Sequence, residues 1–272
     1  MRRSTSSIAR RGVDGVLKSV GSRVVTREEE AATEKRYRSV VTQLHDAYAS
    51  WFSPALTDRP GRIELLCSLM GTETTEALFL LHWLQQAMDG SGDVCELGVA
   101  QGATSALLAN EIRTSDRTLW LYDSFRGLSA PHDKDELLDD IFELGAMDRY
   151  EGSMSFGKAA VLGRLRSVRF PEERIRVVEG FIRPDLEAEL LPATVAFAYL
   201  DFDLYEPILT GLNLLHSRCR PGSILMIDDY GYFSSGPHTA VTEFHAANPG
   251  RYELLEAPAG AGHFCALRRT EP

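Results

Sequence analysis

Two apolar runs of this chain each end in a pair of carboxylates, and this pattern constrains the fold more than any other feature. Asp201 and Asp203 follow one run, and Asp228 and Asp229 follow the next. Glu206–His216 between the runs is typical of a helix, so the segment predicts one parallel strand–helix–strand unit. Ligands of open α/β sheets bind outside the carboxyl ends of the strands. We therefore expect both pairs of acids at a binding edge.

These acids have two interpretations. As loop acids or helix N-caps they need no ligand, and for Asp203 this interpretation is at least as good as the other. Asp201, Asp228 and Asp229 are different, because carboxylates buried without a counter-charge are costly. A divalent cation would remove that cost. The sequence therefore predicts one metal site at Asp201, Asp228 and Asp229.

The pattern of apolar runs along the rest of the chain predicts a doubly wound, Rossmann-like α/β fold with a mostly parallel seven-stranded sheet. A terminal antiparallel hairpin is expected, because its two strands are joined by a Gly- and Pro-rich turn. The expected strands are Val94–Val99, Thr118–Tyr122, Ile175–Glu179, Val195–Leu200, Ser223–Ile227, Tyr252–Glu256 and His263–Leu267. Thr72–Met88 and Ala103–Ile112 are expected as helices.

Residues 1–61 differ from the rest of the chain and are expected to form a basic arm and a helical extension, with a domain over 62–272. Among the first 27 positions, only Asp14 opposes the basic residues Arg2, Arg3, Arg10, Arg11, Lys18, Arg23 and Arg27. The arm resembles an amphipathic targeting segment but lacks the apolar core of a signal peptide, so contact with a partner subunit is the favoured interpretation. Ser129–Pro171 is a long insertion, which we expect to act as a lid.

Composition excludes several classes of protein. A net charge of −10 argues against a general nucleic-acid binder, because phosphate contacts need a positive face. No run approaches the roughly 20 apolar residues of a membrane span. The four cysteines are widely spaced and show no metal-binding pattern, which indicates thiols in a reducing compartment. We expect a soluble, cytoplasmic enzyme.

A glycine-containing turn follows the first expected strand. In Glu96-Leu97-Gly98-Val99-Ala100-Gln101-Gly102, the two glycines let the backbone approach a ligand closely, although a tight turn without a ligand has the same pattern. Glu96 stands where the dinucleotide fingerprint needs glycine, which disfavours a nicotinamide cofactor.

The next two strands also end in residues suited to a nucleoside. Asp123 closes the second strand, where an acid can accept both ribose hydroxyls, or else act as an N-cap. Glu179-Gly180-Phe181 ends the third strand, where a polar group and an aromatic could flank an adenine.

Taken together, these motifs resemble the macrocin O-methyltransferase family from about Leu65 to the C-terminus. The motifs that carry the resemblance are Glu96-Leu97-Gly98 with Gly102, Tyr122-Asp123-Ser124-Phe125-Arg126-Gly127-Leu128, Leu200-Asp201-Phe202-Asp203-Leu204-Tyr205-Glu206, Ile227-Asp228-Asp229-Tyr230 and Gly236 with Ala240-Val241 and Glu243-Phe244. The resemblance implies a class I methyltransferase that uses S-adenosylmethionine to methylate sugar hydroxyls of natural products. It also suggests a homo-oligomer.

The resemblance implies a role for each matching residue. Glu96, Gly98, Gly102 and Thr104 would surround the methionine portion of S-adenosylmethionine, and Asp123 and Ser124 would hold its ribose. Asp201, Asp228 and Asp229 would ligate Mg²⁺, and Asp201 would also serve as the general base. All-oxygen ligands suit Mg²⁺, and coordination of a hydroxyl to a divalent cation lowers its pKa.

Two positions leave the acceptor open. Phe202 stands where the family commonly has glycine, and it would narrow the acceptor pocket or stack on a ring. His238 lies near the predicted site, as a proton-transfer group or as a surface histidine. The favoured acceptor is a sugar or glycosylated small molecule. The alternatives are a catechol-type aromatic diol, or a non-catalytic S-adenosylmethionine-binding subunit.

Overall fold

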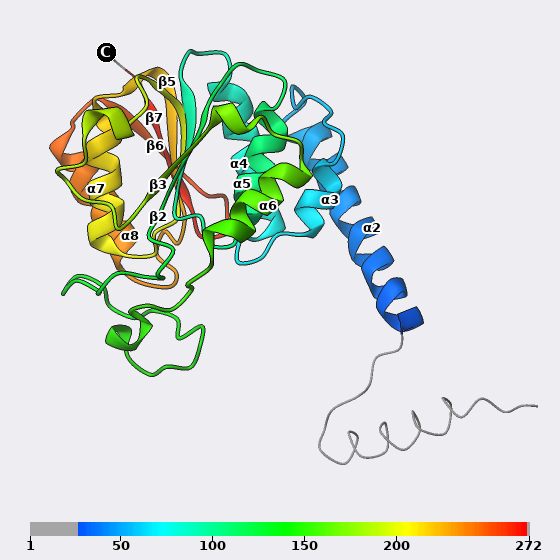
Figure 1. The fold of residues 1–272 in the computed structure, drawn as a ribbon, viewed down its shortest axis with the longest axis horizontal. Coiled ribbons are helices and arrows are strands. Elements are labelled where there is room, and N and C mark those ends of the chain that lie inside the picture. The colour runs from blue at the N-terminus through cyan, green and yellow to red at the C-terminus, as the bar shows by residue number, and fades with distance from the viewer. Residues whose placement is uncertain (1–26, 271–272) are drawn as a thin grey trace, which may run out of the picture.

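A computed structural model describes residues 27–270 of the chain, and within them the strands form one sheet of order β3-β2-β1-β4-β5-β7-β6 (Figure 1). The strands are β1 (Asp93–Leu97), β2 (Leu119–Asp123), β3 (Ile175–Glu179), β4 (Val195–Leu200), β5 (Cys219–Ile227), β6 (Tyr252–Glu256) and β7 (Cys265–Arg269). Strands β1 to β5 are parallel, and β7 runs antiparallel between β5 and β6. The predicted doubly wound fold with a terminal antiparallel pair is confirmed.

Helices cover both faces of this sheet. The α-helices are α2 (Arg27–Trp51), α3 (Arg62–Cys67), α4 (Thr74–Ala87), α5 (Ala103–Ile112), α6 (Lys158–Ser167), α7 (Tyr205–His216) and α8 (Gly236–Ala247), and the 3₁₀ turns are η1 (Met147–Tyr150), η2 (Glu172–Arg174) and η3 (Ala188–Leu190). Helices α4, α5 and α6 lie on one side of the sheet, and α7 and α8 lie on the other (Figure 1). This is the layering that right-handed βαβ crossovers produce.

The two layers form two hydrophobic cores, one on each face of the sheet. Strand β4 contributes to both, because side chains alternate along a strand. Phe197 and Tyr199 pack with α4 and α5, whereas Ala198 and Leu200 pack with α7 and α8. Every residue of β4 is buried, which explains why its sequence reads as an unbroken apolar run.

The insertion at 129–171 contains folded structure that its sequence did not indicate. Helix α6 lies within it and buries Val161 and Leu165, and η1 places Tyr150 in a small core with Leu204 and Phe233. Two backbone hydrogen bonds join Leu128, just before the insertion, to residues 152–153 within it, and we call this junction the neck. They run from Leu128 N to Ser153 O (3.0 Å) and from Gly152 N to Leu128 O (3.0 Å). The insertion is therefore attached to the domain at defined points, and its action as a lid stays a prediction.

The N-terminal extension and the expected domain share one core. The first part of α2 extends away from the rest of the chain, and its second part packs inward through Val41, which is buried (Figure 1). The basic residues Arg2 to Arg23 lie outside the described residues. No helix in the described part of the chain has both the length and the apolar character needed to cross a bilayer.

Gly127 and Gly152 lie at the neck and allow a matched test of its packing. Gly127 and Gly152 both adopt the left-handed backbone conformation, at φ 85° and 76°. A Cβ at Gly127 would lie 2.1 Å from Ser153 O, whereas a Cβ at Gly152 would meet nothing within 4 Å. We predict that Gly152→Ala lowers the free energy of unfolding by about 1 kcal/mol, from backbone strain alone.

Gly127→Ala should cost a further 1–3 kcal/mol, roughly the range for overpacking a filled site. Urea unfolding of both variants measures the difference, and limited proteolysis reports whether cleavage within 129–157 accelerates. Equal costs for the two variants would show that the neck does not pack as described.

Candidate active site

The register of the parallel strands brings the predicted site residues to one edge of the sheet. Leu97 at the end of β1 pairs with Tyr122 of β2 and with Leu200 of β4, and Leu200 pairs with Ile227 of β5. The residues that follow these strands therefore begin at the same level. The strand order reverses between β1 and β4, which is where doubly wound sheets bind ligands.

The glycine turn after β1 lies directly against the end of β4. Gly98 has a φ of 88°, and a Cβ there would lie 1.8 Å from Asp201 O. The backbones are joined by a hydrogen bond from Asp201 N to Leu97 O (2.7 Å). Gly102 begins α5 at φ 79°, where a Cβ would lie 3.0 Å from Val161 of α6. Both glycines thus permit close packing, one against β4 and the other against α6.

Asp123 organises the glycine turn from the end of β2. Its Oδ2 accepts hydrogen bonds from Val99 N (2.7 Å) and Ala100 N (3.1 Å), and its Oδ1 accepts one from Phe125 N (2.6 Å). Ser124 shapes the following turn by donating to Gly127 O (2.9 Å). These contacts give both residues a structural role, and their contacts with a ribose stay predictions.

Glu96 and Thr104 lie beneath the glycine turn rather than on its surface. Glu96 is 1% exposed and accepts a hydrogen bond from Ser105 Oγ on α5. Burial raises the pKa of Glu96 to about 8, the hydrogen bond from Ser105 lowers it, and the charge of Asp123 raises it. Thr104 is also buried, with its Oγ1 3.2 Å from Thr72 Oγ1. Their predicted contact with the donor remains untested, and both support the turn from below.

The end of β3 lies beside Asp123. Glu179 pairs with Asp123 across the two strands, and Gly180 N donates to Asp123 O (2.9 Å). The exposed Glu179 carboxylate forms an ion pair of 3.2 Å with Lys158 Nζ of α6. Such exposed pairs contribute little stability, so Glu179 is free to exchange this partner for a ligand.

Three acids of the predicted metal region come together. They include Asp203 in place of Asp228, which the sequence had predicted as the third ligand. Asp201, Asp203 and Asp229 each offer an oxygen within 4.8 Å of the others. Asp203 and Asp229 adopt the left-handed conformation, at φ 61° and 53°, which turns both side chains into this cluster. Each of the three is partly exposed and therefore reachable by a ligand.

The electrostatics of this cluster are those of uncompensated carboxylates. Burial and then the neighbouring carboxylates raise the pKa of Asp201 and Asp203 well above the ordinary value, and the same causes raise that of Asp229 to about 7. Within residues 27–270, no Lys, Arg or His side chain forms an ion pair with any of the three. An all-oxygen, negatively charged set fits a hard divalent cation such as Mg²⁺.

Asp228, which the sequence placed in the metal set, belongs to a buried hydrogen-bond network. Its Oδ2 lies 2.6 Å from Tyr199 Oη, which lies 2.9 Å from Glu76 Oε1 of α4. Its Oδ1 accepts from Asp229 N (2.8 Å). Burial, followed by the charge of Asp228, raises the pKa of Glu76 well above its ordinary value. Since the tyrosine hydroxyl has a single proton, a protonated Glu76 would supply the second hydrogen bond of the network.

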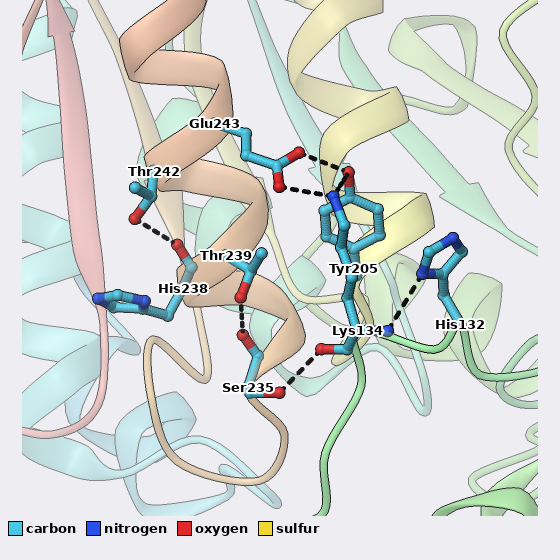
Figure 2. A network of polar contacts seen from close by, with 8 residues as sticks. All are labelled: His132, Lys134, Tyr205, Ser235, His238, Thr239, Thr242 and Glu243. Carbon is cyan, nitrogen blue, oxygen red and sulfur yellow. Dashed lines mark hydrogen bonds and ion pairs between the residues drawn. The ribbon is translucent and has the colours of Figure 1, made fainter.

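Sequence reasoning missed Glu76 and Tyr199. Tyr199 sits inside an apolar strand and reads as a core aromatic. Glu76 shares one helical stripe with Leu80 and Leu84, and an acid in an apolar stripe was the available signal. His238 lies at the start of α8 (Figure 2) and is exposed. Its ring centroid is 4.8 Å from that of Tyr230, and its part in catalysis stays a prediction.

The strand order, the glycine turn after β1 and the antiparallel end of the sheet define the Rossmann-like fold of class I methyltransferases. The chain belongs to the macrocin-O-methyltransferase family, whose family model matches residues 72–256.

Curated relatives share about a quarter of the aligned residues. The chain is 27% identical over 149 residues to demethyldecarbamoylnovobiocin O-methyltransferase of Streptomyces niveus, covering 51% of this chain and 53% of that protein. It is 28% identical over 160 residues to mycinamicin III 3''-O-methyltransferase of Micromonospora griseorubida, covering 56% and 61%. The chain therefore matches little more than half the length of these relatives.

Solved structures share the fold over a larger part of the chain. The O-methyltransferase NovP superposes with a TM-score of 0.61 at 22% identity, covering 73% of this chain and 81% of NovP. The calicheamicin methyltransferase CalS11 gives a TM-score of 0.56 at 21% identity, covering 90% and 94%.

The raised pKa of Glu96 gives a testable pH dependence of stability. Its pKa in the folded protein is about 8, whereas that of an unfolded glutamate is about 4.3. The folded state therefore keeps the proton that the unfolded state loses. The resulting stability is fully present below about pH 4.3 and is lost as pH rises through about 8.

We predict that the stability of the wild type falls relative to Glu96→Gln between pH 5 and pH 7.5, by up to about 1.4 kcal/mol per pH unit. Urea unfolding of both proteins across this range measures it. Parallel pH profiles would mean that Glu96 is ionised in the folded protein.

Proposed function

We propose that this protein is an S-adenosylmethionine- and Mg²⁺-dependent O-methyltransferase that methylates a hydroxyl of a sugar or glycosylated natural product. The observation that supports this proposal most is the contact between the glycine turn at Gly98 and the backbone of Asp201. It sets a candidate donor site and a candidate acceptor site side by side. Family membership supports methyl transfer. The name of one relative, a rhamnosyl-tetracenomycin C 4'-O-methyltransferase, supports a sugar hydroxyl as the acceptor.

In this proposal the donor lies along the ends of β1, β2 and β3. Gly98 and Gly102 let the backbone approach the methionine portion, above Glu96 and Thr104. Asp123 and Ser124 hold the ribose, with Asp123 exchanging a backbone N–H partner for a ribose hydroxyl. Glu179 and Gly180 flank the adenine. The alignment of acceptor oxygen, methyl carbon and sulfur is the main catalytic task, because the sulfonium is already activated.

Asp201 and Asp229 are the proposed metal ligands that belong both to the set read from the sequence and to the observed cluster. Asp228, read from the sequence, and Asp203, brought in by the fold, compete for the third place. When bound, Mg²⁺ would lower the pKa of an acceptor hydroxyl. Asp201 would accept the hydroxyl proton as general base. The hydroxyl oxygen then takes the methyl group as the carbon–sulfur bond breaks, which leaves S-adenosylhomocysteine.

Further parts of the proposal concern the surroundings of the site. Residues 129–171 would act as a lid, and Phe202 would narrow the acceptor pocket. We propose a cytoplasmic enzyme, which is supported by four free thiols, three of them buried. A homo-oligomer is proposed from the family resemblance. The division into an N-terminal extension (1–61) and a methyltransferase domain (62–272) is proposed from the composition of the first 61 residues.

Calorimetric titration and a methyl-transfer assay test this proposal together. We expect S-adenosylmethionine to bind the wild type with micromolar affinity and to bind Asp123→Ala much more weakly, because the variant loses the turn contacts. Transfer of labelled methyl groups to a panel of sugars, glycosides and aromatic diols should require Mg²⁺ and should stop with a chelator.

Asp201→Asn should lower transfer by about 10²–10⁴-fold, the usual contribution of a general base, while donor affinity stays unchanged. Asp203→Asn and Asp228→Asn, compared side by side, decide the third ligand. Full activity of Asp201→Asn in chelator would contradict the metal mechanism. Transfer to diols alone would select the catechol-type alternative, and donor binding without any transfer would select the non-catalytic subunit.

A further inference from the structure

A buried acid of the insertion, Asp135, contacts the starts of two helices that follow the candidate metal site. Asp135 is 6% exposed. Its Oδ1 accepts a hydrogen bond from Tyr205 N (2.7 Å), the first residue of α7. Its Oδ2 accepts one from His132 N (2.8 Å) within the insertion. Helix α7 has no capping side chain at Leu204, so Asp135 supplies the cap from a distant part of the chain.

Ser234 links this buried carboxylate to Asp203. Ser234 Oγ donates to Asp203 O (2.8 Å) and lies 3.4 Å from Asp135 Oδ1. The backbone that follows Asp203 is therefore held at two points, the carbonyl of Asp203 and the N–H of Tyr205. This matters because Asp203 adopts the left-handed conformation, which is uncommon for residues other than glycine and needs support from its surroundings.

The same carboxylate of Asp135 lies against the start of α8, which is the helix that follows the loop after Asp229. A Cβ at Gly236, the first residue of α8, would lie 1.8 Å from Asp135 Oδ1. Glycine is thus needed there to admit the acid. Burial raises the pKa of Asp135, and the hydrogen bonds from the backbone N–H groups of His132 and Tyr205 lower it. The partial positive charge of the helix N-termini offsets part of the cost of burying this acid.

The flanking contacts of the insertion are more exposed. Lys134 Nζ contacts Glu243 Oε1 (2.5 Å) and Tyr205 Oη (2.9 Å), and Ser235 Oγ donates to Lys134 O (2.8 Å) (Figure 2). An exposed ion pair contributes little on its own. The buried hydrogen bonds of Asp135 are therefore the specific part of this attachment.

We propose that Asp135 is a positioning residue that holds Asp203 and the loop after Asp229 so that their carboxylates can share one divalent cation with Asp201. This inference rests on the proposed function. It gives the insertion a role separate from closure, because its first segment fixes the geometry of the acidic cluster.

Asp135→Asn, with Asp133→Asn as control, tests this proposal. The asparagine keeps the size of the side chain but replaces one accepting oxygen with an NH₂ group, so one backbone N–H loses its acceptor. Asp133 is exposed, and Asp133→Asn removes the same charge two positions away. We measure titrations with Mn²⁺ alone and with S-adenosylmethionine alone.

We expect Asp135→Asn to weaken Mn²⁺ binding at least tenfold while S-adenosylmethionine affinity stays within twofold, and Asp133→Asn to change neither. Unchanged Mn²⁺ affinity would overturn the proposal. Equal losses of both affinities would also overturn it, because they would indicate general destabilisation.

Amide hydrogen exchange separates this inference from the proposed function. Exchange should accelerate at 203–205 and 229–236 in Asp135→Asn and stay unchanged at 96–104. If the wild type binds no Mn²⁺, the metal part of the proposed function fails. Exchange at 203–205 then decides the positioning role, and unchanged exchange there would overturn it.

Discussion

The close approach of the ends of β1 and β4 is the constraint on which the rest of the site depends. Asp201 N donates to Leu97 O (2.7 Å), and the absence of a side chain at Gly98 lets the two backbones meet. Any larger residue would push the glycine turn away from the acids. Because the proposed methyl transfer needs donor and acceptor in line, this contact supports the placement of both candidate sites at one edge of the sheet.

The acidic cluster beside this contact is held together from outside. Asp201, Asp203 and Asp229 repel one another and have no positive partner among residues 27–270. Two buried supports come from distant elements. Glu76 of α4 and Tyr199 form a buried network with Asp228. Asp135 accepts a hydrogen bond from the start of α7 and lies against Gly236 at the start of α8. The surrounding fold therefore sustains an arrangement that is unfavourable until a cation binds.

The sequence predicted the strands well because a buried parallel strand must be apolar on both faces, and a run such as 195–200 admits few other structures. The edge position of Asp123, Asp201 and Asp229 follows from parallel topology alone. Helix α6 was missed because only Val161 and Leu165 of its residues are buried, which leaves no strong period. The place of Asp203 in the cluster could not be predicted, because it depends on a backbone φ of 61°. The role of Asp135 could not be predicted either, because it depends on a hydrogen bond to a residue 70 positions along the chain. Neither feature leaves a local signal in the sequence.

Anomalous diffraction from a crystal grown with Mn²⁺ and S-adenosylhomocysteine would show whether the metal and the donor bind at the same edge of the sheet. We expect a single manganese peak at about 2.2 Å from oxygens of both Asp201 and Asp229, near the range for hard cations. We also expect the homocysteine portion at Gly98 and the ribose at Asp123. A manganese peak away from these acids, or S-adenosylhomocysteine bound elsewhere on the sheet, would contradict the claim that one edge joins both sites.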